Sequence, residues 1–499
     1  MWFFSCILLF STIATPPQLK SLLSSLDPLS VSQHLAFYDL YSDTPEGKKA
    51  LAHAWHLLSG GKVSSKTVQL PSLDIQAIIS LITREPHEPP PALNAEQIAA
   101  IDSIASKLAH QSLPGHQVWT KEALLALPHE HVDLARGLLL YQFDENAEKI
   151  RQYEALLDLM ALQILARIPQ SATPYDKIRE INRFIFEEMH FRFPPHSLYA
   201  KEIDLYTFLP SVLDSREGVC LGVSILYLSI AQRIGLPLEI ITPPGHIYVR
   251  YREGVRLTNI ETTARGINLP SETYLGIDTR RLQQRTMKEV IGTAFINEAS
   301  VAWMQENYEK SVELYLKAAP FLPDDPLHKF LLGLNYLFVG KKAEAKKLLS
   351  PLQKFTFDHA VSAETIPEDY FSGRVDAEGI KAVFLHVDAD RKSILEKQKK
   401  LQEITRRYPR FRAGLFHLAI TWLQLGRMTE AKQVLEKYHA LDPHNATVEY
   451  YLSISSVERY DYLSAWKYLH STEELLDARE HKCKALRGLK DHLRRTCPN

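Results

Sequence analysis

Cysteine is scarce in this chain. Only four occur among 499 residues, at the widely separated positions Cys6, Cys220, Cys483 and Cys497. They form no CxxC pair of the kind that binds metals, and four scattered thiols are not the framework of a disulfide-stapled domain. Cys483 and Cys497 are close enough in sequence to be bridged in an oxidising compartment, and otherwise both are unpaired thiols.

Glycine is also scarce, and neither charge sign dominates. The chain has 20 glycines, so long runs of helix-forming residues stay uninterrupted, which favours a mainly helical fold. Lys and Arg number 58 against 59 Asp and Glu. No basic run is interleaved with aromatic residues, so nothing favours nucleic acid as a partner. No apolar run is long enough for an integral membrane span.

Several short motifs of cofactor and metal enzymes are absent from the sequence. It contains no Walker loop, no dinucleotide-binding glycine pattern, no HExxH and no GxSxG. His129-Glu130-His131 is the densest group of possible ligands, but two histidines two positions apart point to different faces of a helix. We therefore expect neither a cofactor nor a metal site.

The N-terminus allows two interpretations. Residues 2–10 are strongly apolar, small residues follow up to Ala14, and Pro16 comes shortly after. Residues 1–14 are thus either a cleaved export signal that lacks the usual basic start or part of a buried N-terminal helix. We then expect a helical region over 15–168, divided by a proline-rich break at 85–91, with Asn94 as the N-cap of a helix running from Ala95 to His110.

The residue pattern changes over 169–290, where strand-forming runs appear among the helices. Gly218-Val219-Cys220 should open an apolar helix that runs to Ile234 and ends at Gly235-Leu236-Pro237. Strands are expected over 238–242, from His246 onward after a Pro-Pro-Gly turn, and over 255–262. This β-rich patch predicts a small antiparallel sheet packed on the Cys220 helix.

An internal repeat follows. Small residues recur 34 positions apart, at Ser311 and Ala345 and again at Ala431 and Ala465. A 34-residue helix–turn–helix period is the signature of tetratricopeptide repeats. We expect repeat units over 291–355 and over 386–499, the latter closed by a C-terminal helix. The stretch 356–385 breaks the register and is either an insertion or a degenerate unit.

The candidate site lies in the central segment. A thiolate nucleophile is favoured at a helix N-terminus beside an imidazole, and Cys220 and His246 offer both. The imidazole must in turn be oriented by an acceptor. Glu261 is the first choice and Asn259 the alternative third member, since both lie on the next expected strand and share a face.

Three blocks carry a family resemblance: Glu217–Ser224 around the cysteine, Pro243–Arg250 around the histidine, and Asn259–Thr263. Together they resemble the papain-like thiol core of the transglutaminase-like superfamily over about 170–275. More narrowly they resemble a bacterial branch in which that core precedes tetratricopeptide repeats. The resemblance implies a Cys-His-Asp triad, and here Glu261 stands where the Asp is usual, before Thr262. The implied fold is mainly α, with a central α+β papain-like core and a C-terminal α-superhelix.

The function that follows is thiol-dependent amide or acyl chemistry of the protease, deamidase or transglutaminase type. The array would bind a protein or peptide partner and stand apart from the chemistry. The alternative is a catalytically inactive scaffold that binds peptides or proteins. A cleaved signal would place the protein in the periplasm or cell envelope. Without such a signal, the protein would be expected in the cytoplasm.

Overall fold

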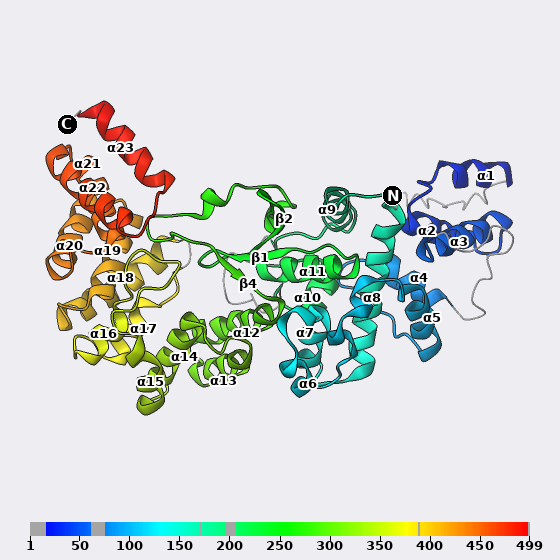
Figure 1. Ribbon diagram of the computed structural model, residues 1–499, viewed down its shortest axis with the longest axis horizontal. Helices are drawn as coiled ribbons and strands as arrows, with labels where there is room; N and C mark the ends of the chain where they lie inside the picture. Colours follow the sequence, from blue (N-terminus) through cyan, green and yellow to red (C-terminus); the bar gives the residue numbers. More distant parts are fainter. Residues whose placement is uncertain (1–15, 61–74, 170, 195–205, 388–389, 498–499) are drawn as a thin grey trace, which may run out of the picture. The chain divides into compact units, whose positions relative to one another are not determined.

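The computed structural model describes residues 16–60, 75–169, 171–194, 206–387 and 390–497 (Figure 1), so the signal-like segment 1–14 lies outside the description. Residue contacts divide the chain into two compact units. The first comprises residues up to 119, 139–190 and 229–236, and the second comprises 120–138, 191–228 and 237 onward.

The first unit is helical. Its helices are α1 (Pro16–Ser25), α2 (Val31–Leu40), α3 (Pro45–Leu58), α4 (Gln76–Thr83), α5 (Ala95–Ala105), α8 (Ala147–Arg167) and α9 (Pro174–Asn182), continued by a π-helical turn over Arg183–Glu188. Asn94 caps α5 in a capping box with Gln97, as expected, but the helix ends at Ala105 rather than His110. Helix α8 is buried along most of its length and contacts α3, α4, α5 and α9, so it is the centre of this unit's core.

A buried ion pair fixes the last turn of α11 (Cys220–Arg233) to α8. Arg233 Nε lies 2.7 Å from Asp158 Oδ1, and both side chains are almost fully buried. Asp158 has a pKa raised to about 6, because burial disfavours its charge more than the Arg233 guanidinium favours it. Removing either partner would leave an uncompensated polar group in the core.

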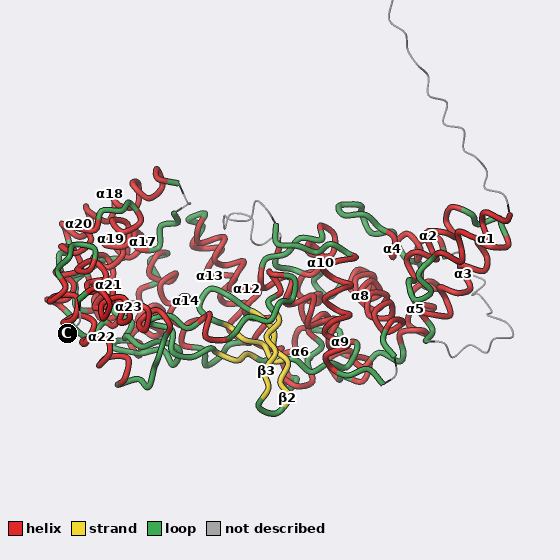
Figure 2. The backbone as a smooth tube through the Cα atoms, turned by 90° about the horizontal axis from the view of Figure 1, so that it is seen from above, coloured by secondary structure: helices red, strands yellow, loops and turns green. Residues whose placement is uncertain are grey.

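The second unit contains one small sheet. Its strands are β1 (Glu239–Thr242), β2 (Tyr248–Glu253), β3 (Arg256–Ile260) and β4 (Gln283–Arg285), in the antiparallel order β3-β2-β1-β4. The first three agree with the expected strands, whereas β4 was not foreseen. Helix α11 lies beside the sheet (Figure 1), in which Figure 2 shows β2 and β3 side by side. A hydrogen bond of 2.9 Å joins Ser224 Oγ of α11 to Thr262 Oγ1 beyond β3.

Helices precede and follow this sheet in the second unit. They are α6 (Lys121–Ala126), α10 (Leu209–Ser215), α12 (Met287–Met304), α13 (Tyr308–Ala318), α14 (Pro326–Phe338), α15 (Lys342–Leu349), α16 (Ile366–Phe371), α17 (Ala377–Val383), α18 (Arg391–Arg407), α19 (Arg412–Gln424), α20 (Met428–Leu441), α21 (Ala446–Val457), α22 (Tyr462–Asp477) and α23 (Lys484–Thr496). Helices α7 (Leu134–Gln142) and α11 each continue into residues of the first unit.

Helices α12 to α15 and α19 to α22 are consecutive packed pairs. The small residues that defined the 34-residue period are all fully buried: Ser311, Ala345, Ala431 and Ala465. Ser311 Oγ donates to Ala299 O at 3.0 Å, and Ser453 Oγ donates to Ala465 O at 2.8 Å, so each bond joins the two helices of one pair. The fold is therefore mainly helical with a helical repeat array at its C-terminal end, as the sequence predicts.

The register break contains a long loop, α16 and α17. Its loop pairs with the segment between β3 and β4, because Arg280 N–H donates to His359 O at 2.8 Å and Val361 N–H donates to Asp278 O at 3.1 Å. The end of the array holds the same segment, where His481 Nε2 lies 2.7 Å from Gly276 O. Within the described residues no helix is long and apolar enough to cross a membrane.

Candidate active site

Cys220 is the first residue of α11, as the sequence Gly218-Val219-Cys220 predicts. The chain before it is held by Val219 N–H, which donates to Tyr206 O at 3.0 Å. A Cβ on Gly222 would lie 2.1 Å from that same oxygen. Only glycine therefore lets the backbone at Tyr206 pack this closely against the first turn of α11. Cys220 is half-buried and stands at the positive end of the helix dipole.

His246 is aimed by a tight turn. Its backbone N–H donates to Pro243 O at 3.0 Å, and Gly245 has φ +71. Proline at the second position and glycine at the third, with positive φ, are the pattern of a type II turn. The strand begins at Tyr248 and not at His246, so the histidine belongs to the turn.

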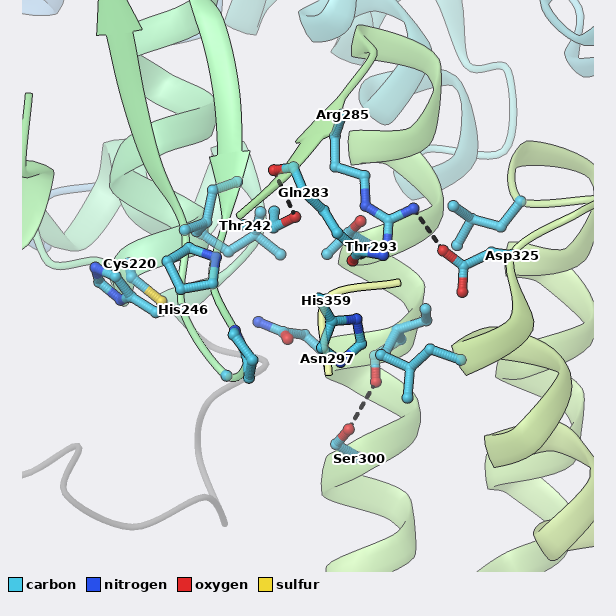
Figure 3. A pocket seen from close by; sticks show the side chains of 18 residues that line it. Cys220, Thr242, His246, Gln283, Arg285, Thr293, Asn297, Ser300, Asp325 and His359 are labelled. Atoms are coloured by element: carbon cyan, nitrogen blue, oxygen red, sulfur yellow. Dashed lines mark hydrogen bonds and ion pairs between the residues drawn. The ribbon is translucent and has the colours of Figure 1, made fainter. Parts of the chain in front are cut away.

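The His246 ring connects the thiol to a carboxylate. Figure 3 shows the Cys220 sulfur beside the ring, and its interaction with the thiol raises the pKa of His246. On the other side, Nε2 lies 2.7 Å from Glu261 Oε2. Because Glu261 engages Nε2, Nδ1 is the nitrogen left for the sulfur.

Glu261 is surrounded by donors. Its Oε1 accepts from the Thr263 N–H at 3.1 Å and from the Thr263 hydroxyl at 2.6 Å. Its Oε2 accepts from His246 and from the Tyr274 hydroxyl. The Tyr274 ring also stacks on the His246 ring, with centroids 5.6 Å apart. Sequence reasoning missed Tyr274, since it lies outside the three blocks and follows no local pattern.

These contacts shift two pKa values in opposite directions. Burial disfavours the Glu261 carboxylate, but the hydrogen bonds from His246, Thr263 and Tyr274 outweigh it and lower the pKa to about 2. Burial also disfavours the His246 imidazolium, but its bonds to Cys220 and Glu261 raise the pKa of His246 to about 9. At neutral pH the geometry therefore favours an imidazolium held against a carboxylate.

Asn259 is placed differently from Glu261. Its Oδ1 accepts from Arg250 Nε at 2.8 Å, and its Nδ2 donates to Leu269 O at 2.6 Å and to Ser271 Oγ at 3.1 Å. Arg250 also donates to the Tyr248 hydroxyl at 2.8 Å. The Asn259 amide thus belongs to a buried network that joins β3 to Arg250 of β2 and to the loop after β3. The Glu261 carboxylate, in contrast, lies beside His246.

A pocket of about 440 Å³ opens at Cys220 and His246. The sheet side contributes Thr242, Gln283 and Arg285. The opposite wall comes from the repeat array and its register break: Thr293, Ile296, Asn297, Ser300, Leu322, Asp325, Leu327 and His359. Helices that follow the sheet therefore line one side of the pocket (Figure 3). The expectation that the array takes no part in the chemistry stays a prediction.

The charged side chain that the sheet contributes to the pocket is paired with carboxylates. Arg285 is paired with Asp325 and, at 3.2 Å, with Glu289. Burial lowers the pKa of His359, which favours its neutral form, and among the described residues its buried Nδ1 has no hydrogen-bond partner. No trio of metal-ligating side chains in the described part of this pocket is close enough to hold an ion.

A family model described as the transglutaminase-like superfamily matches residues 151–300. That stretch contains Cys220, His246 and Glu261, so the chain carries a transglutaminase-like domain followed by helical repeats. Among curated proteins, F-box only protein 21 of Mus musculus is 30% identical over 110 residues, which are 22% of this chain and 16% of that protein. The Homo sapiens protein is 34% identical over 92 residues, 18% and 13% of the two chains. The chain thus matches only about one-sixth or less of their length.

Solved structures resemble the repeats weakly. A fragment of MamA from Desulfovibrio magneticus RS-1 aligns with a TM-score of 0.20 and 14% identity, over 38% of this chain and 96% of that one. A thermophilic tetratricopeptide protein of Thermus thermophilus aligns with a TM-score of 0.21 and 15% identity, over 40% and 98%.

Proposed function

We propose that this protein performs thiol-dependent amide or acyl chemistry through Cys220, His246 and Glu261. The observation that supports it best is the His246 ring, which lies beside the Cys220 sulfur on one side and 2.7 Å from the buried Glu261 carboxylate on the other. A nucleophile, a base and a group that orients the base are the parts of a thiol acyl-transfer site.

The reaction has two halves. The proton of the Cys220–His246 pair lies on His246 Nδ1, and the Cys220 thiolate attacks the carbonyl carbon to give a tetrahedral oxyanion. When the carbon–nitrogen bond breaks, the leaving amine takes the proton from His246 and a thioester remains. Water or a second amine then attacks the thioester and gives its proton to His246, and the thiolate leaves. Water as acceptor makes the protein a protease or deamidase, and an amine makes it a transglutaminase.

A protein or peptide substrate suits the array. A second pocket of about 340 Å³, lined among others by Phe330, Phe357 and Phe416, shares Leu327 and His359 with the Cys220 pocket. An extended peptide with its reacting carbonyl at Cys220 could thus run past His359 onto aromatic side chains of the repeats. Concave repeat surfaces of this kind commonly bind peptides.

Alkylation with peptide mapping tests the chemistry. At pH 7, iodoacetamide should label Cys220 faster than Cys497, which is also half-buried and serves as an internal control. Replacing His246 by Asn should abolish the difference. Equal rates at the two cysteines in the folded wild-type protein would contradict the proposal and favour the inactive scaffold.

Saturable labelling tests the peptide route. Peptides that carry a chloroacetamide group should label Cys220 with a rate that saturates as their concentration rises. Phe416→Ala should weaken that saturation, because it removes an aromatic wall of the second pocket. Leu463→Ala is the control, since Leu463 is exposed on α22 away from both pockets. Equal effects of the two substitutions would argue against this route.

A further inference from the structure

The pocket wall opposite Cys220 is one face of α12. Thr293, Ile296, Asn297 and Ser300 all line the pocket, and their spacing of three and four residues places them on one side of the helix. Two of the three polar members are already satisfied within the helix. Thr293 Oγ1 donates to Glu289 O and Ser300 Oγ donates to Ile296 O, both at 2.9 Å.

Asn297 is the exception on this face. In the described part of the chain, its amide makes one recorded hydrogen bond, from Nδ2 to Thr207 Oγ1 at 3.5 Å, which is the outer limit for such a bond. Figure 3 shows its side chain reaching from α12 into the pocket toward the side where Cys220 and His246 lie. A partly buried amide with so weak a contact is free to donate to a group bound at the thiol.

An acyl-transfer site needs donors at the position where the carbonyl oxygen becomes negative. The backbone N–H of Cys220 is one, because an N–H in the first turn of a helix has no acceptor within that helix. One donor is seldom sufficient, and the core blocks that suggested the triad contain no obvious second. The pocket's cation, Arg285, is already paired with carboxylates.

We propose that Asn297 is the second oxyanion donor, supplied by α12, the helix in which the transglutaminase-like match ends and from which the packed helix pairs begin. The proposal rests on the function proposed for Cys220. Asn297 Nδ2 donates to the substrate carbonyl oxygen, and the bond strengthens as that oxygen becomes negative in the tetrahedral intermediate. Helix α12 then has a chemical role in addition to packing.

Two thiol reagents isolate this role. Alkylation by iodoacetamide displaces iodide from a saturated carbon and forms no oxyanion. Acylation by p-nitrophenyl acetate passes through a tetrahedral oxyanion and releases p-nitrophenolate. In the full-length protein, Asn297→Ala should slow acylation of Cys220 by about 10²-fold and leave the alkylation rate within about twofold of the wild-type value.

Two further variants sharpen the test. Asn297→Asp keeps the side-chain shape but places a non-donating carboxylate at the oxyanion, so it should slow acylation at least as much as the alanine variant. It also preserves the packing of α12 should the alanine variant fail to fold. Gln305→Ala removes an exposed amide at the end of the same helix and should match the wild type in both reactions.

Each other outcome overturns the inference. Equal slowing of both reactions by Asn297→Asp would show that Asn297 merely positions the thiol. Unchanged acylation would show that it donates nothing, and slowing by Gln283→Ala instead would assign the donor to β4. Failure of wild-type Cys220 to react selectively with iodoacetamide would refute the proposed function itself. Selective alkylation with acylation unaffected by Asn297 would refute only this inference.

Discussion

Replacing Glu261 by Gln changes hydrogen-bonding chemistry with almost no change in shape. All of the contacts of the Glu261 carboxylate come from donors: the His246 ring, the Tyr274 hydroxyl, and the N–H and hydroxyl of Thr263. A Gln oxygen can still accept from Thr263, but its NH₂ would then face His246 and Tyr274. His246 would have to present an unprotonated Nε2, which moves its proton to Nδ1, the nitrogen that must receive the Cys220 proton.

The magnitude follows from the pKa of Glu261. Its fall from 4.5 to about 2 corresponds to about 3.4 kcal/mol in favour of the charged carboxylate, or at most about 300-fold in the population of the charged pair. The Glu261 side chain is only 4% exposed, so solvent screening reduces this little. Because Thr263 and Tyr274 share the interaction with His246, we expect Glu261→Gln to slow alkylation of Cys220 by about tenfold to a hundredfold.

The assay is the second-order rate constant for iodoacetamide at pH 6.5, read by peptide mapping and accompanied by a thermal melt. Glu272→Gln is the matched control, because Glu272 is an exposed glutamate in the same part of the chain. A folded Glu261→Gln protein that labels as fast as the wild type would refute the assignment of Glu261 as the residue that orients His246.

Three further predictions concern stability. Asn259→Ala removes one of the acceptors of the buried Arg250, the one that takes its Nε–H, so it should destabilise the fold by about 1–3 kcal/mol. It should nevertheless slow labelling of the folded protein less than Glu261→Ala does, and the reverse ranking in labelling rate would make Asn259 the third triad member. The pKa of His246, about 9 against an ordinary 6.5, implies stabilisation of up to about 3 kcal/mol that is complete below pH 6.5 and lost as the pH rises through 9. In denaturant titrations the stability lost on His246→Asn should therefore shrink over that range, and a constant difference would show that the histidine is not held as an imidazolium. Ala431→Leu should overpack the fully buried contact of α20 and cost about 1–3 kcal/mol; an unchanged melting temperature would argue against the repeat register.

Local chemistry explains what the sequence could predict. The start of α11 at Cys220, the turn before His246 and the cap at Asn94 all depend on residues within a few positions of one another. The 34-residue period needed only small residues recurring at helix contacts, since each repeat packs mainly on its neighbours. The order of the three blocks was enough to nominate Glu261, whose nearness to His246 then follows from the pairing of β2 with β3.

What the sequence could not predict depends on contacts between distant segments. Strand β4 has three residues, Gln283–Arg285, none of them β-branched, and it is a strand because Ile240 and Ile241 of β1 pair with it. Tyr274 reaches Glu261 across a loop without a repeating pattern. Asn297 and the hydroxyls around it follow helical spacing, and that spacing could have marked a polar face on α12. Nothing local, however, indicates that this face meets Cys220.

The break in the repeat register coincides with the point where the array meets the site. A helical array interrupted only by loss of a unit would leave a surface loop with few partners. Here the loop of the 356–385 stretch forms a bridge from Ala360 to Thr279, and Ser362 N–H donates to Asp278 Oδ1 at 2.7 Å. The same loop carries His359 to the wall of the Cys220 pocket. A regular repeat has no segment able to pair with the chain between β3 and β4, so the departure from the 34-residue period allows the array to close one side of the pocket.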